Sequence, residues 1–303
     1  MTSGRVSSSI VSDDNSLAGS QPRATTPRPS ERPIRPRAID LPLDQGIPRS
    51  WMGGNVVATA IANSVNMLFP AGERFFVRSV RHYLPELPSE LRERVLGFFG
   101  QEGRHAQAHE RVNSAIALNG YQVEGFLRLY ERFCYGAVER ISPPELRLAA
   151  TAACEHFTAI MAHNFLSNES FVQGLDPTMR RLLQWHAAEE IEHKSVAYDV
   201  LSAVAPSYPL RVAGMAVASA ILGLFWLGGT GVLLTQDVQQ LGWRHVLNDL
   251  RRLGRFRREN HHRGIVREVF AHGIRQYLRG DFHPDELDDY ELARRLLEQV
   301  GLA

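Results

Sequence analysis

Two pairs of a glutamate and a histidine three residues apart could do chemistry in this chain: Glu102 with His105, and Glu190 with His193. Residues three apart lie on the same face of an α-helix, so both side chains of a pair can reach one point beside the helix. Carboxylate oxygens and imidazole nitrogens bind divalent metal ions. One such pair carries little weight by itself, but two pairs predict two halves of a metal site.

One further glutamate precedes each pair on its own helical segment, Glu73 before the first pair and Glu155 before the second. The order along the chain is thus Glu, Glu-x-x-His, Glu, Glu-x-x-His. Ferritin-like di-iron and di-manganese carboxylate proteins have this arrangement, with four helices that point the ligands into the core of a bundle. The order therefore predicts a site for two metal ions.

The surroundings of the two single glutamates support burial. Every residue from Val56 to Gly72 before Glu73 is uncharged, and Glu155 follows an uncharged stretch of small residues. Glutamates and histidines on helices are usually solvated surface charges, which is the alternative interpretation. An ionised carboxylate in apolar surroundings is costly unless it is paired. Two divalent ions would balance four such carboxylates, so the metal site is favoured.

Three more residues compete for a place at this site. With about 100° per residue, His186, Glu190 and His193 fall within about 60° of one another on one helix, which makes His186 a seventh candidate. Glu189 lies at the edge of the same arc and competes with Glu190. His109, one turn beyond His105, is ambiguous. The predicted ligands are Glu73, Glu102, His105, Glu155, His186, Glu190 and His193.

Helices must position these side chains. From Trp51 onward, apolar residues recur at three- and four-residue spacing, which predicts an all-α protein. The expected helices cover 54–84, 89–118, 122–140, 143–168 and 177–204. The segment 122–140 carries no candidate ligand and is expected to be the crossover between two helix pairs. We expect a disordered Ser/Pro/Arg-rich tail over 1–50, a ferritin-like dimetal bundle over 51–205, and a C-terminal helical extension over 206–303.

Composition narrows the partners and the compartment. The net charge of +1 provides no excess of positive charge for phosphates, so a nucleic acid is not an expected partner. The two cysteines, Cys134 and Cys154, form no C-x-x-C pair, and the first fifty residues contain no apolar stretch long enough for a secretory signal. We therefore expect a reduced, cytoplasmic compartment.

The segment 212–236 contains no charged residue and is long enough to span a bilayer. A true span would separate the bundle from the Arg-rich stretch 251–258 and place the bundle outside the cell. That orientation disagrees with the absence of a signal. Three alternatives remain: a helix buried against the bundle, an interface in a homodimer, and a peripheral or re-entrant membrane contact.

The chain resembles a bacterial family described as predicted metal-dependent hydrolases, over roughly residues 50 to 290. The resemblance rests on Phe69-Pro-Ala-Gly-Glu73-Arg-Phe-Phe, Gln101-Glu102-Gly-Arg-His105 and His186-Ala-Ala-Glu-Glu190-Ile-Glu-His193-Lys. The ligand order is also similar to that of the di-iron p-aminobenzoate N-oxygenases. In those enzymes an added histidine, one turn before the last Glu-x-x-His pair, completes three histidines and four carboxylates. By position, the resemblance implies this role for His186.

Three classes of function fit a dimetal site. We expect an enzyme that uses two iron ions, or alternatively manganese or zinc, to activate O₂ and oxidise a small apolar or aromatic substrate, with an electron donor as partner. The alternative is a two-metal hydrolase of an ester or amide. The third is a non-enzymatic iron-binding protein. The added imidazole of His186 favours the first class, because a hydrolytic metal pair does not need it.

Overall fold

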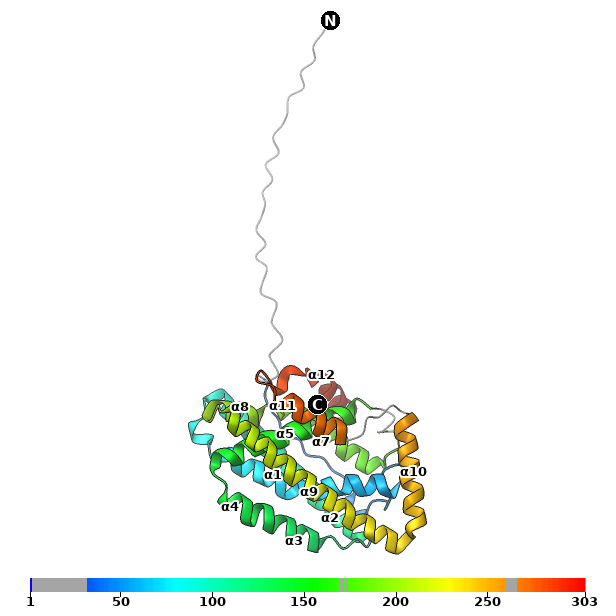
Figure 1. Ribbon diagram of the computed structural model, residues 1–303. Coiled ribbons are helices and arrows are strands. Elements are labelled where there is room, and N and C mark those ends of the chain that lie inside the picture. The colour runs from blue at the N-terminus through cyan, green and yellow to red at the C-terminus, as the bar shows by residue number, and fades with distance from the viewer. Residues whose placement is uncertain (2–31, 169–171, 173, 260–265, 303) are drawn as a thin grey trace.

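The computed structural model describes residues 1, 32–168, 172, 174–259 and 266–302. Within these ranges the elements are helices, and the single β-bridge joins Met52 to Leu175 (Figure 1). The predicted all-α fold is confirmed. A ferritin-like bundle is compatible with this arrangement and stays a prediction.

Four long helices carry the candidate site: α1 (Val56–Arg81), α2 (Ser89–Leu118), α5 (Pro144–Leu166) and α7 (Pro177–His193). The helix α1 packs along α2, α5 packs along α7, and α1 also contacts α5. Side chains mark two of the starts, because Asn55 accepts a hydrogen bond from the backbone of Ala58, and Asp176 caps α7. These caps satisfy amide groups that have no partner within the helix.

The segment 177–204 differs from the single helix that was expected. The helix α7 ends at His193, and α8 (Val196–Val204) begins after a turn at Lys194 and Ser195. The Lys194 ammonium donates a hydrogen bond to Asp289 at 2.6 Å, so a residue far along the chain holds this turn. No glycine or proline marks the break, which is why the local pattern did not show it.

The predicted crossover helix 122–140 consists of three pieces: α3 (Glu124–Glu131), a π-helix, η4 (Arg132–Val138), and α4 (Glu139–Ile141). The backbone N–H of Glu139 bonds the carbonyl of Cys134, five residues earlier, as a π-turn requires. None of the candidate ligands lies on this crossover.

The C-terminal part of the chain contains α9 (Tyr208–Leu241), α10 (Trp243–Glu259), η5 (Val266–His272), α11 (Gly273–Tyr277), η6 (Pro284–Glu286) and α12 (Tyr290–Gln299). The apolar segment 212–236 lies within α9, which crosses α1 and α5 (Figure 1). A Cβ on Gly214 would lie 2.4 Å from the carbonyl carbon of Ala149, so only glycine permits this close approach.

The outer side of α9 is exposed. This helix is long and apolar enough to cross a membrane, and 28 % of its apolar stretch is buried in the structure. Leu224 and Leu227 are among its exposed side chains. The helix is thus packed against the bundle on one side and open on the other. The membrane contact and the homodimer stay predictions.

The N-terminal segment requires a correction. Disorder was predicted for 1–50, of which 2–31 lie outside the described residues, but 32–47 form a strap against the bundle that includes one 3-10 turn, η2 (Leu43–Gln45). The strap buries Ile34, Leu41, Leu43 and Ile47. Its Ile34 and Pro36 lie over two glycines of α2, where an added Cβ would come within 2.4 Å of Ile34 and 2.3 Å of Pro36. Disorder was wrong for this part because four widely spaced apolar anchors outweigh the polar composition.

Candidate metal centre

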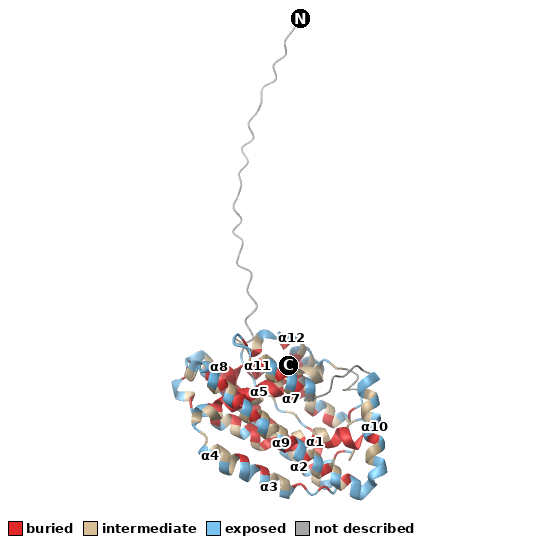
Figure 2. Ribbon diagram, in the orientation of Figure 1, coloured by how far each residue is buried: buried red, intermediate tan, exposed pale blue. Residues whose placement is uncertain are grey.

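All seven predicted ligands lie on the inward faces of the four long helices. Each is at most 4 % exposed, as are His109 and Glu189. Figure 2 shows how buried residues concentrate inside the bundle, whereas α10 is mostly exposed. The helical spacing therefore brings together side chains from four separate segments of the sequence, and it places them away from water.

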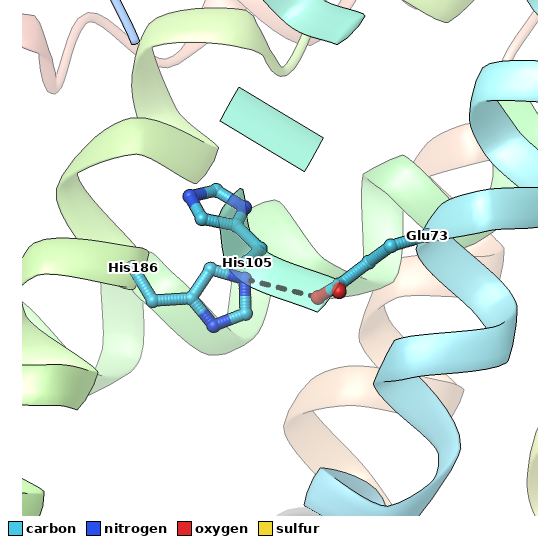
Figure 3. Close-up of side chains that lie close together, drawn as sticks. All are labelled: Glu73, His105 and His186. Carbon is cyan, nitrogen blue, oxygen red and sulfur yellow. Dashed lines mark ion pairs between the residues drawn. The ribbon is translucent and has the colours of Figure 1, made fainter. Parts of the chain in front are cut away.

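The first cluster contains Glu73 from α1, His105 from α2 and His186 from α7 (Figure 3). One ligand atom from each of the three lies within 4.8 Å of the others. The His186 Nε2 atom is 3.7 Å from Glu73 Oε1. A metal ion at their centre would have one carboxylate and two imidazoles as ligands.

The second cluster contains Glu102, Glu190 and His193, whose ligand atoms also lie within 4.8 Å of one another. The His193 Nε2 atom is 3.2 Å from Glu102 Oε1 and 3.5 Å from Glu190 Oε2. Glu155 of α5 joins this group, with its Oε2 atom 3.4 Å from the same nitrogen. Four helices thus supply the two clusters.

The glutamates of the two Glu-x-x-His pairs lie between the clusters. Glu102 Oε1 is 3.5 Å from His105 Nδ1 and 3.2 Å from His193 Nε2. Glu190 turns one oxygen to each side, with Oε1 2.8 Å from His186 Nε2 and Oε2 3.5 Å from His193 Nε2. This placement suits carboxylates that bridge two metal ions.

The inward atoms of these residues have no hydrogen-bond partner. They are both carboxylate oxygens of Glu73, Glu102 and Glu155, Oε2 of Glu190, Nδ1 of His105 and Nε2 of His193. A buried polar atom without a partner is rare and destabilising, and here nine of them converge on one place. Two divalent cations would pair with these atoms and balance the four carboxylates. The residues present therefore fit a dimetal centre.

The pKa values of the four glutamates also support a cation site. Burial and the neighbouring carboxylates raise the pKa of Glu73 and of Glu102 well above the usual value, and burial raises the pKa of Glu155 to about 7. Burial would also raise the pKa of Glu190, but the charge of His193 and the His186 ring, 2.8 Å from its Oε1 atom, hold it well below normal. The metal-free centre thus retains protons that bound cations would replace.

His105 is held from behind by Glu189. Its Nε2–H donates to Glu189 Oε2 at 2.9 Å, which leaves Nδ1 without a hydrogen toward the clusters. Glu189 in turn accepts hydrogen bonds from the backbone N–H of Arg37 at 3.0 Å and from its guanidinium at 3.3 Å. The structure therefore places Glu189 behind an imidazole and Glu190 between the clusters.

His193 is supported in the same manner. Its Nδ1–H donates to Gln101 Oε1 at 2.8 Å, so Nε2 faces the carboxylates. Gln101 Nε2 donates to Glu192 at 2.8 Å, and Arg37 binds Glu192 through two hydrogen bonds of 2.6 and 2.8 Å. A single arginine of the strap therefore steadies the supports of both clusters.

His109 lies behind His186. Its Nδ1–H donates to Asn66 Oδ1 at 2.5 Å, so its Nε2 accepts from His186 Nδ1–H at 2.8 Å. This tautomer leaves His186 Nε2 without a hydrogen in the neutral imidazole, although Glu190 Oε1 is only 2.8 Å away. Two acceptors at that distance need a cation between them, either a proton or a metal ion.

Sequence reasoning missed two of these supports. Arg37 lies in a segment predicted to be disordered, and Gln101 is an ordinary polar residue next to a ligand. Gln101 could have been found from the rule that a metal-binding imidazole needs a partner on its other nitrogen. No local signal marks Arg37, because its partners, Glu189 and Glu192, are about 150 residues away in the chain.

A cavity of about 330 Å³ reaches the centre at His186 and Glu190. Its walls are mainly apolar and include Phe69, Met161 and Trp226. Tyr130 lines a second, smaller cavity of about 100 Å³. Phe69 and Met161 line both this cavity and the larger one. The larger one has the size and lining of a small-molecule site.

The family model for predicted metal-dependent hydrolases matches residues 35–288. The chain belongs to this family. The match includes the helices of both clusters and also most of the strap. No curated protein and no solved structure matches the chain significantly. The family is described as metal-dependent, in agreement with the two clusters, and its description favours hydrolysis over the oxygen activation expected from His186.

Proposed function

We propose that this family member is a two-metal hydrolase that cleaves an ester or amide of a small, largely apolar molecule. The observation that carries the proposal is the pair of clusters with nine unpartnered buried atoms, beside a cavity with apolar walls. The family description supports the same reaction class.

The residues divide between two ions. Glu73, His105 and His186 would hold one ion and Glu155 with His193 the other, while Glu102 and Glu190 would contact both. When bound, two divalent ions polarise a carbonyl oxygen and lower the pKa of a bound water. Zinc, manganese and iron all suit this mixed set of carboxylates and imidazoles.

The chain's own residues would orient the substrate and control protons. Phe69, Met161 and Trp226 would bind the apolar part of the substrate and exclude water around the scissile bond. His109 would keep a proton on His186 Nδ1, so that Nε2 stays available at the centre. Glu189 and Gln101 would hold His105 and His193 in the matching tautomers.

The test is hydrolysis by metal-loaded protein. Zinc- or manganese-loaded protein should cleave apolar nitrophenyl esters or anilides, and Glu190→Ala should abolish this activity. Glu110→Ala removes an exposed carboxylate of α2 and should leave it unchanged, which controls for loss of charge. Loaded protein that binds two ions but cleaves none of these compounds with zinc, manganese or iron would reject the hydrolase.

One observation favours a second candidate, the activation of O₂ by two iron ions with an electron donor as partner. His186 gives the centre a third imidazole, and a neutral nitrogen donor supplies electron density that tunes a redox-active ion. Chemically reduced, iron-loaded protein should then consume O₂, as measured with an oxygen electrode, and His186→Ala should change the rate. O₂ uptake without ester hydrolysis would favour this candidate over the hydrolase.

A further inference from the structure

The cavity beside the metal centre connects two chemically different ends. At the inner end its walls include His186 and Glu190. At the other end they include Leu253, Phe256 and Arg257 of α10, and Arg257 is the exposed residue among the walls that the structure describes, so we take this end as the outer one. Between the two ends the walls are mainly apolar.

The helix that borders the outer end is basic, and its Arg257 lines the cavity. The helix α10 contains six arginines against two acidic residues. Asp249 pairs with Arg252 at 3.0 Å, which leaves five arginines against Glu259. Figure 1 shows α10 along one edge of the bundle, and most of its residues are exposed. A cleft bordered by charge of one sign concentrates ligands of the opposite charge.

The inner end does not attract an anion in the same way. Four carboxylates surround the two clusters, and two divalent ions would bring their summed charge only to zero. The difference in charge between the ends therefore orients an anionic molecule with its charged group at α10. Its apolar part would extend along the cavity toward His186 and Glu190.

We propose that the cavity binds a single-chain anionic amphiphile, with the anionic group at α10 and an apolar chain that leads to the metal centre. Since a water-sized group takes up about 30 Å³, a cavity of about 330 Å³ holds a chain of about ten such groups. If the proposed hydrolase function holds, the scissile ester or amide is at the far end of this chain from the anionic group. Binding itself does not depend on that reaction.

The experiment measures binding by titration calorimetry on full-length, zinc-loaded protein below the critical micelle concentration. The probes share a ten-carbon chain: decane-1-sulfonate, decan-1-ol and decyltrimethylammonium. Sulfonate is a weak metal ligand, so its preference reports on the outer end. It should bind most tightly at low ionic strength, and salt should reduce this advantage.

Two sets of variants locate the site. Arg257→Gln should weaken sulfonate binding about two- to five-fold without changing decanol binding, while Arg257→Lys, which keeps the charge, should restore it. Arg244→Gln removes the same charge at the start of α10, roughly 20 Å away along the helix, and should have no effect. Ala62→Phe fills the cavity and should weaken both probes by at least about ten-fold.

Ala220→Phe, on the exposed side of α9, is the matched control for added volume. Circular dichroism verifies folding, and Leu183→Trp is the second cavity-filling variant if Ala62→Phe does not fold. Sulfonate that binds no better than decanol, or that binds Ala62→Phe and Leu183→Trp as well as the unaltered protein, would overturn the proposal. Because no turnover is needed, hydrolysis of apolar esters together with that result would leave the hydrolase function intact and reject only the substrate class.

Discussion

The two clusters of the candidate metal centre differ in the residues around them, although Glu102 and Glu190 of the second cluster also lie close to histidines of the first. Apart from these two glutamates, the first has three candidate ligands, Glu73, His105 and His186, whereas the second has two, Glu155 and His193. The first is also the one with a histidine, His186, in the wall of the cavity. An ion in the first cluster has three ligands of its own, so we expect it to bind more tightly.

The largest effect should come from removing what the clusters share. Glu190→Ala should lose both ions, because each oxygen faces a different cluster. The remaining buried carboxylates would lack compensation, and breaking such buried pairs costs about 3–5 kcal/mol. Metal analysis and thermal unfolding measure the two effects, with Glu110→Ala as the control. A Glu190→Ala protein that retains either ion would show that the clusters are more independent than proposed.

Removing one imidazole should affect the ions of the two clusters differently. His193→Ala should lose the ion of the second cluster and keep that of the first. His186→Ala should leave the first cluster with two candidate ligands of its own, so that both ions are released at similar rates. A chelator should extract ions from unaltered protein in two phases, with the second-cluster ion first. Single-phase release from unaltered protein would contradict the difference in affinity.

The stability of the metal-free protein should depend on pH in part through Glu155. Because burial raises its pKa to about 7 in the folded state from about 4.5 in the unfolded state, the folded protein binds the extra proton between these values. Stability of the metal-free protein should therefore fall as pH rises from about 4.5 to about 7, by up to about 3 kcal/mol.

Chemical denaturation across this pH range measures the slope. Glu155→Gln should make it shallower without abolishing it, because Glu73 and Glu102 also have raised pKa values. Bound zinc should reverse it, since metal ions compete with protons for the same carboxylates. A stability that rises steadily with pH in the metal-free protein would show that Glu155 is ionised in the fold.

The smallest effects should come from the supporting residues. Gln101→Leu should weaken only the second ion and Glu189→Gln only the first, each by roughly 10- to 100-fold. Arg37→Ala should affect both, because it binds Glu189 and Glu192. Competition with a metal-sensitive dye measures the affinities. Equal effects of Gln101→Leu on both ions would indicate general loosening of the bundle rather than support of His193.

Local periodicity explains why much of this molecule was predictable. The helices predicted over 54–84, 89–118 and 143–168 correspond to α1, α2 and α5, and the seven candidate ligands lie together. A Glu-x-x-His pair shares a helix face whatever the rest of the chain does. Two such pairs and two glutamates in uncharged surroundings can satisfy one another only around cations.

The strap, the turn at Lys194 and Ser195, and the roles of Glu189 and His109 depended on tertiary structure. Arg37 binds Glu189 and Glu192, and Lys194 binds Asp289, across separations that no helical period encodes. Two residues on the same helix face, such as His105 and His109 on α2, become either a candidate ligand or its support according to what packs behind them. The sequence by itself therefore determined which residue types meet in the core, while long-range packing decided which of their atoms face the metal centre and which cavity leads to it.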